Sequence, residues 1–305
     1  MVSSNAALDV NGLAKRYGKI SALNDLTLQV GRGEIFGFLG PNGAGKTTAV
    51  KMLVGLTRPT GGRGSVLGRP LGDRATRLRL GYLPELFRYQ DWLSALEVLA
   101  FHARLARLAS NETGSEIARV LALTGLTARG ADRVGTFSKG MQQRLGIAVA
   151  LLGKPDLIFL DEPTSALDPI GRHDVREILR REQARGATVF LNSHLLSEVE
   201  LVCDRIAIVR RGDVVAQGTI AAIVGAGHAV RVRASCDGTP LNSILAAFGS
   251  VTTDGDAVRV DGVDEQRIPD IIGALIAANA RVYEVRPLAA TLEERFLAMT
   301  EGNVA

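Results

Sequence analysis

The chain alternates short apolar runs with longer segments in which apolar residues recur every three or four positions. Three runs, at residues 34–39, 156–161 and 188–191, are almost continuously apolar, which is typical of parallel strands buried on both faces of a sheet. Residues 88–132 instead follow the helical period, most clearly at 94–105. The pattern therefore indicates an α/β core that contains an inserted helical block.

The pattern changes after residue 218. Residues 225–228 have the composition of a linker. The part that follows predicts a strand, a helix, two strands, a helix and a strand, at residues 229–235, 240–248, 251–253, 257–260, 268–278 and 281–286. This order is that of the ferredoxin-like split βαβ motif, and residues 290–299 predict a closing amphipathic helix. No catalytic constellation is visible there, so dimer stabilisation, regulation and partner binding all remain open roles.

Composition favours a cytoplasmic chain without a membrane span. A length of 305 residues leaves room for one large and one small domain. Hydrophobic residues make up 46% of the positions, which is enough for a substantial core. The apolar run at residues 271–280 is too short for a span and is broken by Asn279. Residues 1–9 lack the zones of a signal peptide. The two cysteines, Cys203 and Cys236, form neither a metal set nor a disulfide framework, so we expect a membrane to be reached only through a partner.

Charge is distributed unevenly along the chain. After Gly227 there are seven arginines, no lysine and eleven acidic residues, so this tail has a net charge of −4 and the preceding part +8. The basic part can face anionic lipid headgroups or nucleic acid, or its charge can be scattered over a solvated surface. No basic segment is interleaved with aromatic residues that stack on bases, and we expect no nucleic-acid partner.

A glycine-rich loop lies between the first apolar run and a predicted helix at residues 48–56. Residues 40–47 read Gly-Pro-Asn-Gly-Ala-Gly-Lys-Thr. Between a strand and a helix, such a loop binds phosphates through its backbone N–H groups. Lys46 is placed to reach the β- and γ-phosphates of a nucleotide, and the Thr47 hydroxyl to ligate Mg²⁺. We expect nucleotide contacts from one continuous segment: Gly40, Pro41, Asn42, Gly43, Ala44, Gly45, Lys46, Thr47 and Thr48.

A second motif places two carboxylates beside this loop. The run at residues 156–161 ends in Asp161 and is followed by Glu162, and ligands of open parallel sheets bind at the carboxyl ends of the strands. Asp161 can hold Mg²⁺ directly or through water, and Glu162 can orient or deprotonate the water that attacks a phosphoryl group. Two acids at a strand end can also form a solvated edge, but Lys46 in the same chain favours the catalytic interpretation.

Between these two motifs the chain resembles the ATP-binding subunits of ATP-binding-cassette (ABC) transporters. Residues 136–144 read Thr-Phe-Ser-Lys-Gly-Met-Gln-Gln-Arg, where the family signature usually contains Leu-Ser-Gly-Gly-Gln. Ser138 and Gly140 match it, and the departures resemble the variant of single-cassette exporter ATPases. The resemblance covers residues 8–218 and implies hydrolysis of ATP with Mg²⁺ as cofactor.

The resemblance assigns roles to further residues. Tyr17 matches the aromatic residue that stacks on adenine, although a lone tyrosine more often serves packing. Residues 165–168, Ser-Ala-Leu-Asp, match the loop that crosses the dimer interface. His194, after the apolar run at 188–191, matches the switch histidine that contacts the γ-phosphate.

Glu85 departs from the family pattern. It ends the segment Gly-Tyr-Leu-Pro-Glu, where the family often has a glutamine that senses Mg²⁺ and water and connects to the membrane partner. A glutamate can bind the metal through oxygen, but it adds a negative charge beside Asp161 and Glu162. The change resembles a form found in drug- and polymer-export ATPases. Gln90 is the alternative candidate, but it lies beyond the Pro-Glu turn.

The implied fold is a P-loop NTPase cassette of the ABC type, with a RecA-like core, an antiparallel β subdomain and a helical subdomain at about residues 86–152. We expect this cassette at residues 1–224 and a small α+β ferredoxin-like domain at residues 225–305. Three aromatic residues at the start of the helical block either anchor a membrane subunit or pack the block onto the core: Phe87, Tyr89 and Trp92.

The family builds each ATP site from two cassettes, and this chain has one phosphate loop and one signature. We therefore expect a head-to-tail homodimer that ATP closes and hydrolysis reopens, with Ser138 and Gly140 capping the γ-phosphate held by the other copy. A separate integral-membrane permease would complete an exporter and hold the chain on the inner face of the cell membrane. An antibiotic, another lipophilic drug, a lipid or glycan, and a sodium ion all remain open as cargo.

Other classes of ABC protein are alternatives. A soluble ATPase that acts on ribosomes usually carries two cassettes joined by a charged linker, and this chain has one. A DNA-repair or chromosome ATPase splits the cassette with a coiled coil or a zinc insertion, and neither heptads nor paired cysteines are present. A catalytically silent cassette in a heterodimer is disfavoured by Glu162 and His194.

Overall fold

The computed structural model describes residues 6–225, 229–236, 240–288 and 291–301. The chain separates into two compact units, Met1–Ile220 and Ala221–Ala305. We expected the boundary after residue 224. The helix α8 (Ile220–Val224) instead contacts the C-terminal helix α11 (Leu292–Glu301), because Arg295 Nε donates a hydrogen bond of 2.9 Å to the carbonyl oxygen of Val224.

Five parallel strands form the centre of the first unit. They lie in the order β9-β3-β8-β7-β6, and every residue of β3, β7 and β8 is buried, as their apolar runs predict. Their bounds are Ile35–Leu39 for β3, Leu80–Leu83 for β6, Leu157–Asp161 for β7, Thr188–Asn192 for β8 and Arg205–Arg210 for β9. Parallel order brings the carboxyl ends of β3, β7 and β8 to one edge of the sheet.

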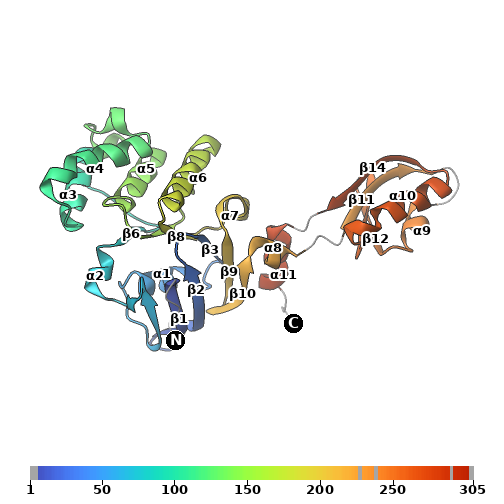
Figure 1. The fold of residues 1–305 in the computed structure, drawn as a ribbon, viewed down its shortest axis with the longest axis horizontal. Helices are drawn as coiled ribbons and strands as arrows, with labels where there is room; N and C mark the ends of the chain where they lie inside the picture. The colour runs from blue at the N-terminus through green and yellow to red at the C-terminus, as the bar shows by residue number, and fades with distance from the viewer. Residues whose placement is uncertain (1–5, 226–228, 237–239, 289–290, 302–305) are drawn as a thin grey trace. The chain divides into compact units, whose positions relative to one another are not determined.

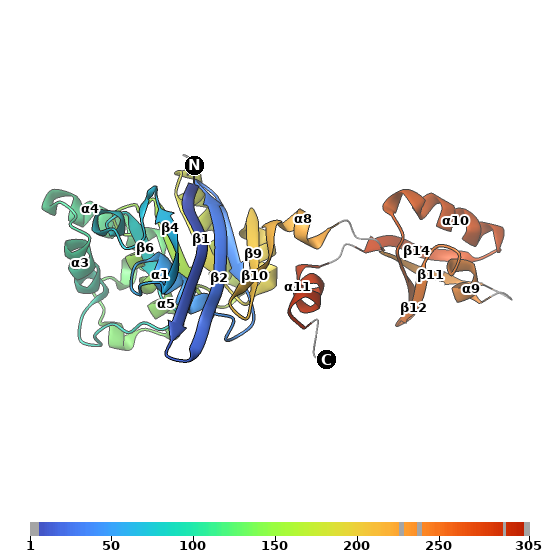
Figure 2. The same ribbon diagram turned by 90° about the horizontal axis from the view of Figure 1, so that it is seen from below.

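The sheet continues into an antiparallel part. The remaining strands of this ten-stranded sheet follow in the order β5-β4-β1-β2-β10, with β10 next to β9. Their bounds are Ala6–Tyr17 for β1, Ile20–Gly31 for β2, Gly61–Val66 for β4, Arg69–Pro70 for β5 and Asp213–Thr219 for β10. The long strands β1 and β2 run side by side (Figure 2). Their alternating inward residues pack with α1 (Lys46–Leu53) in one buried cluster.

Helices α3, α4 and α5 gather into the inserted block (Figure 1). Besides α1, this unit contains α2 (Arg74–Arg77), α3 (Ala95–Leu105), α4 (Ser110–Leu123), α5 (Lys139–Ala150), α6 (Pro169–Ala184) and α7 (Leu196–Val202), with 3₁₀ turns at Thr127–Arg129 and Val134–Thr136. A capping box starts α3, since Ser94 Oγ accepts from the Glu97 N–H and Glu97 Oε2 accepts from the Ser94 N–H. No helix in the described residues is long and apolar enough to span a membrane.

Two predicted helices have different bounds in the structure. The helix after the glycine-rich loop spans Lys46–Leu53 rather than residues 48–56, because Gly45 caps its start and Gly55 turns the chain with φ 79° at its end. In the second unit, α9 spans only Leu241–Leu245 rather than residues 240–248. The chain must turn after α9 to enter the next strand at Ser250.

The second unit has the predicted ferredoxin-like topology. Its four antiparallel strands lie in the order β12-β13-β11-β14, which confirms the split βαβ motif. The elements are β11 (Ala229–Ser235), β12 (Ser250–Asp254), β13 (Ala257–Asp261), a 3₁₀ turn (Glu265–Arg267), α10 (Ile268–Ala277) and β14 (Arg281–Leu288). Val230, Val232, Val258 and Val260 pack with α10 in a separate core. Residues 226–228 of the predicted linker and residue 290 of the predicted closing helix lie outside the described residues.

Candidate active site

The glycine-rich loop between β3 and α1 forms a cradle whose shape requires glycine. Gly45 has φ 98°, and a Cβ there would lie 2.4 Å from the carbonyl oxygen of Ala22. A Cβ on Gly40 would lie 2.3 Å from the carbonyl oxygen of Val209. No larger residue fits at either position without displacing the backbone. The loop can therefore turn its N–H groups toward an anion at the start of α1.

A pocket of about 470 Å³ opens over this loop. Most of the expected nucleotide contacts line it together with two of the carboxylates: Asn42, Gly43, Ala44, Gly45, Lys46, Thr47, Thr48, Glu85 and Glu162. The remaining expected residues are not among those that line it: Tyr17, Gly40, Pro41, Ser138, Gly140, Asp161 and His194. Ile20, Ser21 and Ala22, from the start of β2, were not expected and form its other wall.

Lys46 points back along the loop. Its Nζ donates to the carbonyl oxygens of Gly40, at 2.6 Å, and of Pro41, at 3.2 Å. Burial lowers the pKa of Lys46, against the opposing pull of Glu162, Asp161 and Glu85. The ammonium therefore lies in a partly desolvated position where an anionic partner would favour its charged form.

Asp161 is buried at the end of β7 beside Asn192 at the end of β8. Asn192 Nδ2 donates to Asp161 Oδ1, while Asp161 Oδ2 and Asn192 Oδ1 are buried with no hydrogen-bond partner among the described residues. Burial raises the pKa of Asp161, and the charges of Glu85 and Glu162 add to this effect. Two orphaned oxygens in one buried pair are costly unless a further partner binds them.

The oxygens of Asp161 and Thr47 are suitable ligands for a divalent cation. Mg²⁺ is usually held by one or two protein oxygens together with substrate phosphates and water, and Asp161 and Thr47 supply such oxygens. No cluster of three or more His, Cys, Asp or Glu side chains in the described residues is arranged to hold a metal alone. The donor set therefore suits a cation that arrives with a nucleotide.

Glu162 is fixed by several contacts around a strained backbone. Its φ of 54° is unusual for a residue other than glycine and costs about 1–3 kcal/mol. Its N–H donates to the Asn192 carbonyl oxygen at 2.9 Å. The side chain is 10% exposed, with Oε1 accepting from the His194 N–H at 3.0 Å and Oε2 lying 2.7 Å from His194 Nδ1. The carboxylate thus has a set orientation at the wall of the phosphate pocket.

Glu85 follows β6 and lines the pocket from the side of the helical block. It is exposed, and its charge acts on both Lys46 and Asp161. Gln90, the alternative candidate, lies instead beside Trp92 in a separate surface hollow. The structure therefore brings Glu85, and not Gln90, to the phosphate pocket.

The signature segment lies at the start of α5, and its Ser138 and Gly140 do not line the chain's own phosphate pocket. Ser138 is the exposed N-cap of α5, and its Oγ accepts from the Met141 N–H at 3.2 Å. One turn further, Gln143 Nε2 donates to the carbonyl oxygens of Glu162 and Pro163 at 3.1 and 3.0 Å. The helix that carries the signature is thereby joined to the loop that carries Glu162.

Two aromatic features qualify the expectations. Tyr17 ends β1 with 49% of its surface exposed, and Lys15 Nζ lies 5.0 Å from its ring centroid. Three aromatic residues at the start of the helical block were expected either to anchor a membrane subunit or to pack the block onto the core. Phe87 and Tyr89 are partly buried with ring centroids 5.5 Å apart, whereas Trp92 is 70% exposed.

Asn192 and Gln143 are two further residues to which sequence analysis assigned no role. Asn192 directly follows a buried run in the strand next to β7, and carboxyl-end polar residues of neighbouring strands meet at one edge, so that signal was available. Gln143 lies within the signature segment, but nothing in the sequence gives its partner, because the Glu162 and Pro163 carbonyls are backbone groups.

The buried parallel core, the glycine cradle and the Asp161–Glu162 strand end define a P-loop ATPase of the ATP-binding-cassette class. Residues 23–165 match the family described as ABC transporter. The chain is 40% identical to an uncharacterized ABC transporter ATP-binding protein of Synechocystis, over 92% of this chain and 78% of that one. It is 34% identical to YhcH of Bacillus subtilis, an uncharacterized ABC transporter ATP-binding protein, over 96% and 95%.

Further comparisons agree. A Nod factor export ATP-binding protein I of Burkholderia thailandensis is 35% identical over 97% of this chain and 98% of that one. A solved ATP-binding subunit of an ABC transporter superposes with a TM-score of 0.67 and 34% identity, over 71% of this chain and 91% of the other. A nucleotide-free ATP-binding cassette at 20% identity and TM-score 0.63 supports the fold alone. The chain belongs to the ATP-binding subunits of ABC transporters, which confirms the resemblance and the cassette fold.

Proposed function

We propose that this chain binds ATP with Mg²⁺, hydrolyses it, and powers export through a separate membrane permease. The observation that carries the hydrolytic part is the position of Glu162, whose carboxylate lines the phosphate pocket and is oriented by the N–H and Nδ1 of His194. A carboxylate so placed can position and deprotonate a water that attacks a γ-phosphate.

The other site residues divide the remaining work. The N–H groups of the loop and the Lys46 ammonium would hold the β- and γ-phosphates. Thr47 and Asp161 would hold Mg²⁺, which neutralises charge on the phosphate oxygens when bound. Glu85 would contact the metal or its water, and Tyr17 would stack on adenine.

A second copy of the chain would complete the site. Ser138 and Gly140 lie outside the pocket of their own chain, and the exposed N-cap of α5 suits contact with an anion bound elsewhere. We propose a head-to-tail homodimer in which these residues cap the γ-phosphate of the other copy.

Export through a permease is supported by the relatives that are named Nod factor export ATP-binding proteins. Trp92 is 70% exposed and Leu86, which follows Glu85 in the sequence, is 89% exposed, so both offer an apolar contact for a membrane subunit. We propose that this contact holds the cassette at the inner face of the cell membrane.

Replacing Glu162 with Gln tests the hydrolytic proposal. The variant should lose turnover by roughly 10²–10⁴-fold yet still bind ATP, and it should elute as an ATP-dependent dimer in size-exclusion chromatography with light scattering. Wild-type turnover in the variant would overturn the role of Glu162. A variant that binds ATP but remains monomeric would overturn the dimer.

A further inference from the structure

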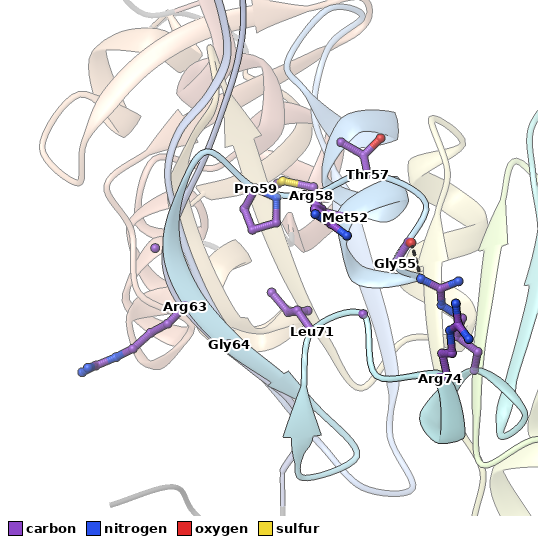
Figure 3. A pocket seen from close by; sticks show the side chains of 12 residues that line it. Met52, Gly55, Thr57, Arg58, Pro59, Arg63, Gly64, Leu71 and Arg74 are labelled. Carbon is purple, nitrogen blue, oxygen red and sulfur yellow. Dashed lines mark hydrogen bonds between the residues drawn. The ribbon is translucent and has the colours of Figure 1, made fainter.

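A second pocket lies at the opposite end of α1 from the phosphate loop. It encloses about 640 Å³ between the turn after α1, strand β4 and helix α2 (Figure 3). Helix α1 has eight residues, so its two ends are about 12 Å apart. None of the residues that line this pocket lines the pocket over the phosphate loop.

Its lining is strongly basic. Four arginines contribute to the wall, and no aspartate or glutamate is found among the lining residues that the structure describes: Arg58, Arg63, Arg74 and Arg77. Residues 51–79 carry seven lysines and arginines and one acidic residue, a net charge of +6. Most of the +8 of residues 1–227 therefore belongs to the segment that contributes the four arginines of this pocket.

The nearby acidic groups are already engaged. Asp73 Oδ1 accepts from the Thr76 N–H at 2.8 Å and from Thr76 Oγ1 at 3.1 Å, and it lies 3.8 Å from Arg69. Asp156 pairs with Arg79 at 2.7 Å, outside the pocket. Among the described residues no carboxylate forms an ion pair with Arg58, Arg74 or Arg77. The arginines that line the pocket therefore retain most of their charge and donors.

Hydrogen bonds to backbone carbonyl oxygens fix the side chain of Arg77 and the turn that carries Arg58. Arg77 Nη2 donates to the Gly55 carbonyl oxygen at 2.8 Å. Gly55 has φ 79°, and a Cβ there would lie 3.1 Å from Arg77 Nε, so glycine leaves room for the guanidinium. The Arg58 carbonyl oxygen accepts from Lys15 Nζ at 2.8 Å, which holds the turn that carries Arg58. Arg74 lies beside the Arg77–Gly55 contact, whereas Arg63 points away from it (Figure 3).

The floor of the pocket is apolar. Met52 is fully buried, and Leu71 and Pro59 are partly buried beside it. A ligand with phosphate groups and a less polar portion would therefore find partners for both parts, within the usual size of small-molecule sites.

We propose that this pocket binds a phosphate-bearing anion, either a free polyphosphate or the headgroup of an anionic lipid. Guanidinium groups match phosphate oxygens with two parallel hydrogen bonds, and such charge-assisted bonds are about twice as strong as neutral ones. Arg58, Arg74 and Arg77 supply these forks, and Arg77 is held in place before the anion arrives. The site is separate from the ATP site and does not depend on hydrolysis.

Titration with sodium tripolyphosphate by calorimetry tests the proposal. The full chain is used in a Lys46→Ala background, which weakens anion binding at the phosphate loop and leaves the same residual binding there in every variant. The pocket variant is Arg58→Ala/Arg74→Ala, because both side chains are exposed. The matched control is Arg32→Ala/Arg104→Ala, two exposed arginines elsewhere with the same loss of charge.

The pocket variant should bind tripolyphosphate at least roughly tenfold more weakly, while the control should stay within about twofold of the parent, as expected for screened surface charge. Circular dichroism should show that both variants are folded. An equal loss in both variants, or no loss in either, would overturn the site.

Sedimentation with vesicles distinguishes the two sources of phosphate. Vesicles of phosphatidylcholine with phosphatidic acid should pellet the parent and the control but not the pocket variant if a lipid headgroup is the ligand. If tripolyphosphate binding depends on Arg58 and Arg74 but vesicle binding does not, the ligand of the pocket is a free anion. Arginine-independent behaviour in both assays contradicts the proposal.

Discussion

The carboxylate of Asp161 is buried at the end of β7, with one oxygen bonded to Asn192 and the other without a partner among the described residues. Its pKa lies above the ordinary value because of burial, with additional repulsion from Glu85 and Glu162. An ionised carboxylate in such a place lowers stability until a cation binds it. Asp161, which suits metal binding, therefore lowers the stability of the protein when no metal is bound.

Asp161→Asn should stabilise the metal-free protein at neutral pH. A carboxyl group with a raised pKa in the folded state destabilises as the pH rises from its ordinary pKa of 3.8 through the raised value. The gain should be absent below that window and present above it. Urea unfolding with EDTA at low and neutral pH measures this. A variant less stable than wild type at neutral pH would contradict the account.

His194→Ala should slow ATP turnover by roughly 10²-fold with a smaller effect on ATP affinity. The change removes the Nδ1 that lies 2.7 Å from Glu162 Oε2 and leaves one backbone donor, so the carboxylate loses its orientation. His173→Ala is the matched control, since His173 is exposed on α6. Equal rates in the two variants would exclude a role for His194 in positioning Glu162.

At the residue scale, the sequence predicts which groups gather but not how each is held. Glycine spacing and the carboxyl-end rule bring Lys46, Asp161 and Glu162 to one edge. The contact between Glu162 and His194 depends on a left-handed backbone at Glu162, which no local pattern encodes for a glutamate. The orphaned oxygens of Asp161 and Asn192 likewise exist only once two strands are adjacent.

At the element scale, an ion network joins the helical block to the core. Arg119 on α4 lies 2.6 Å from Glu116 and 3.5 Å from Glu182 on α6, and it donates to the Leu151 carbonyl oxygen at 2.8 Å. Glu182 also pairs with Arg185 at 2.6 Å. The side chains of Glu116 and Glu182 are only 11% and 4% exposed, so their charges depend on these partners.

Arg119→Ala should destabilise the cassette by about 1–3 kcal/mol, because it leaves Glu116 with a backbone partner only and Glu182 with Arg185 alone. Arg181→Ala, at an exposed position of α6 next to Glu182 in the sequence, should change stability by less than about 0.5 kcal/mol. Urea unfolding of both full-length variants checks this. Equal midpoints would mean that the network contributes nothing.

The elements themselves are predictable where periodicity is strong. The buried runs become β3, β7 and β8, and the ferredoxin-like order holds across β11, β12, β13 and β14. The ends of helices are less predictable, because Gly45 and Gly55 set the bounds of α1 through their backbone conformations. The glycine-rich strand β4 has little apolar pattern of its own and is fixed by pairing with β1.

At the scale of the whole molecule, the two units have separate cores, and all the residues that we propose for the nucleotide site lie in the first unit. Most of the positive charge whose location sequence analysis left open lies between residues 51 and 79, and four arginines of this segment line the second pocket. Composition alone could not locate it, because the arginines come together only when α2 folds beside the end of α1.

The measurement that tests the central claim most directly is a detergent pull-down of the tagged Glu162→Gln chain, with ATP, from membranes of its own cell. The account predicts that a polytopic membrane protein is recovered with the ATP-trapped dimer, and that a Lys46→Ala control, which weakens ATP binding, recovers the dimer poorly. Ribosomal proteins or DNA in place of a membrane protein would contradict the exporter and favour a soluble ABC ATPase.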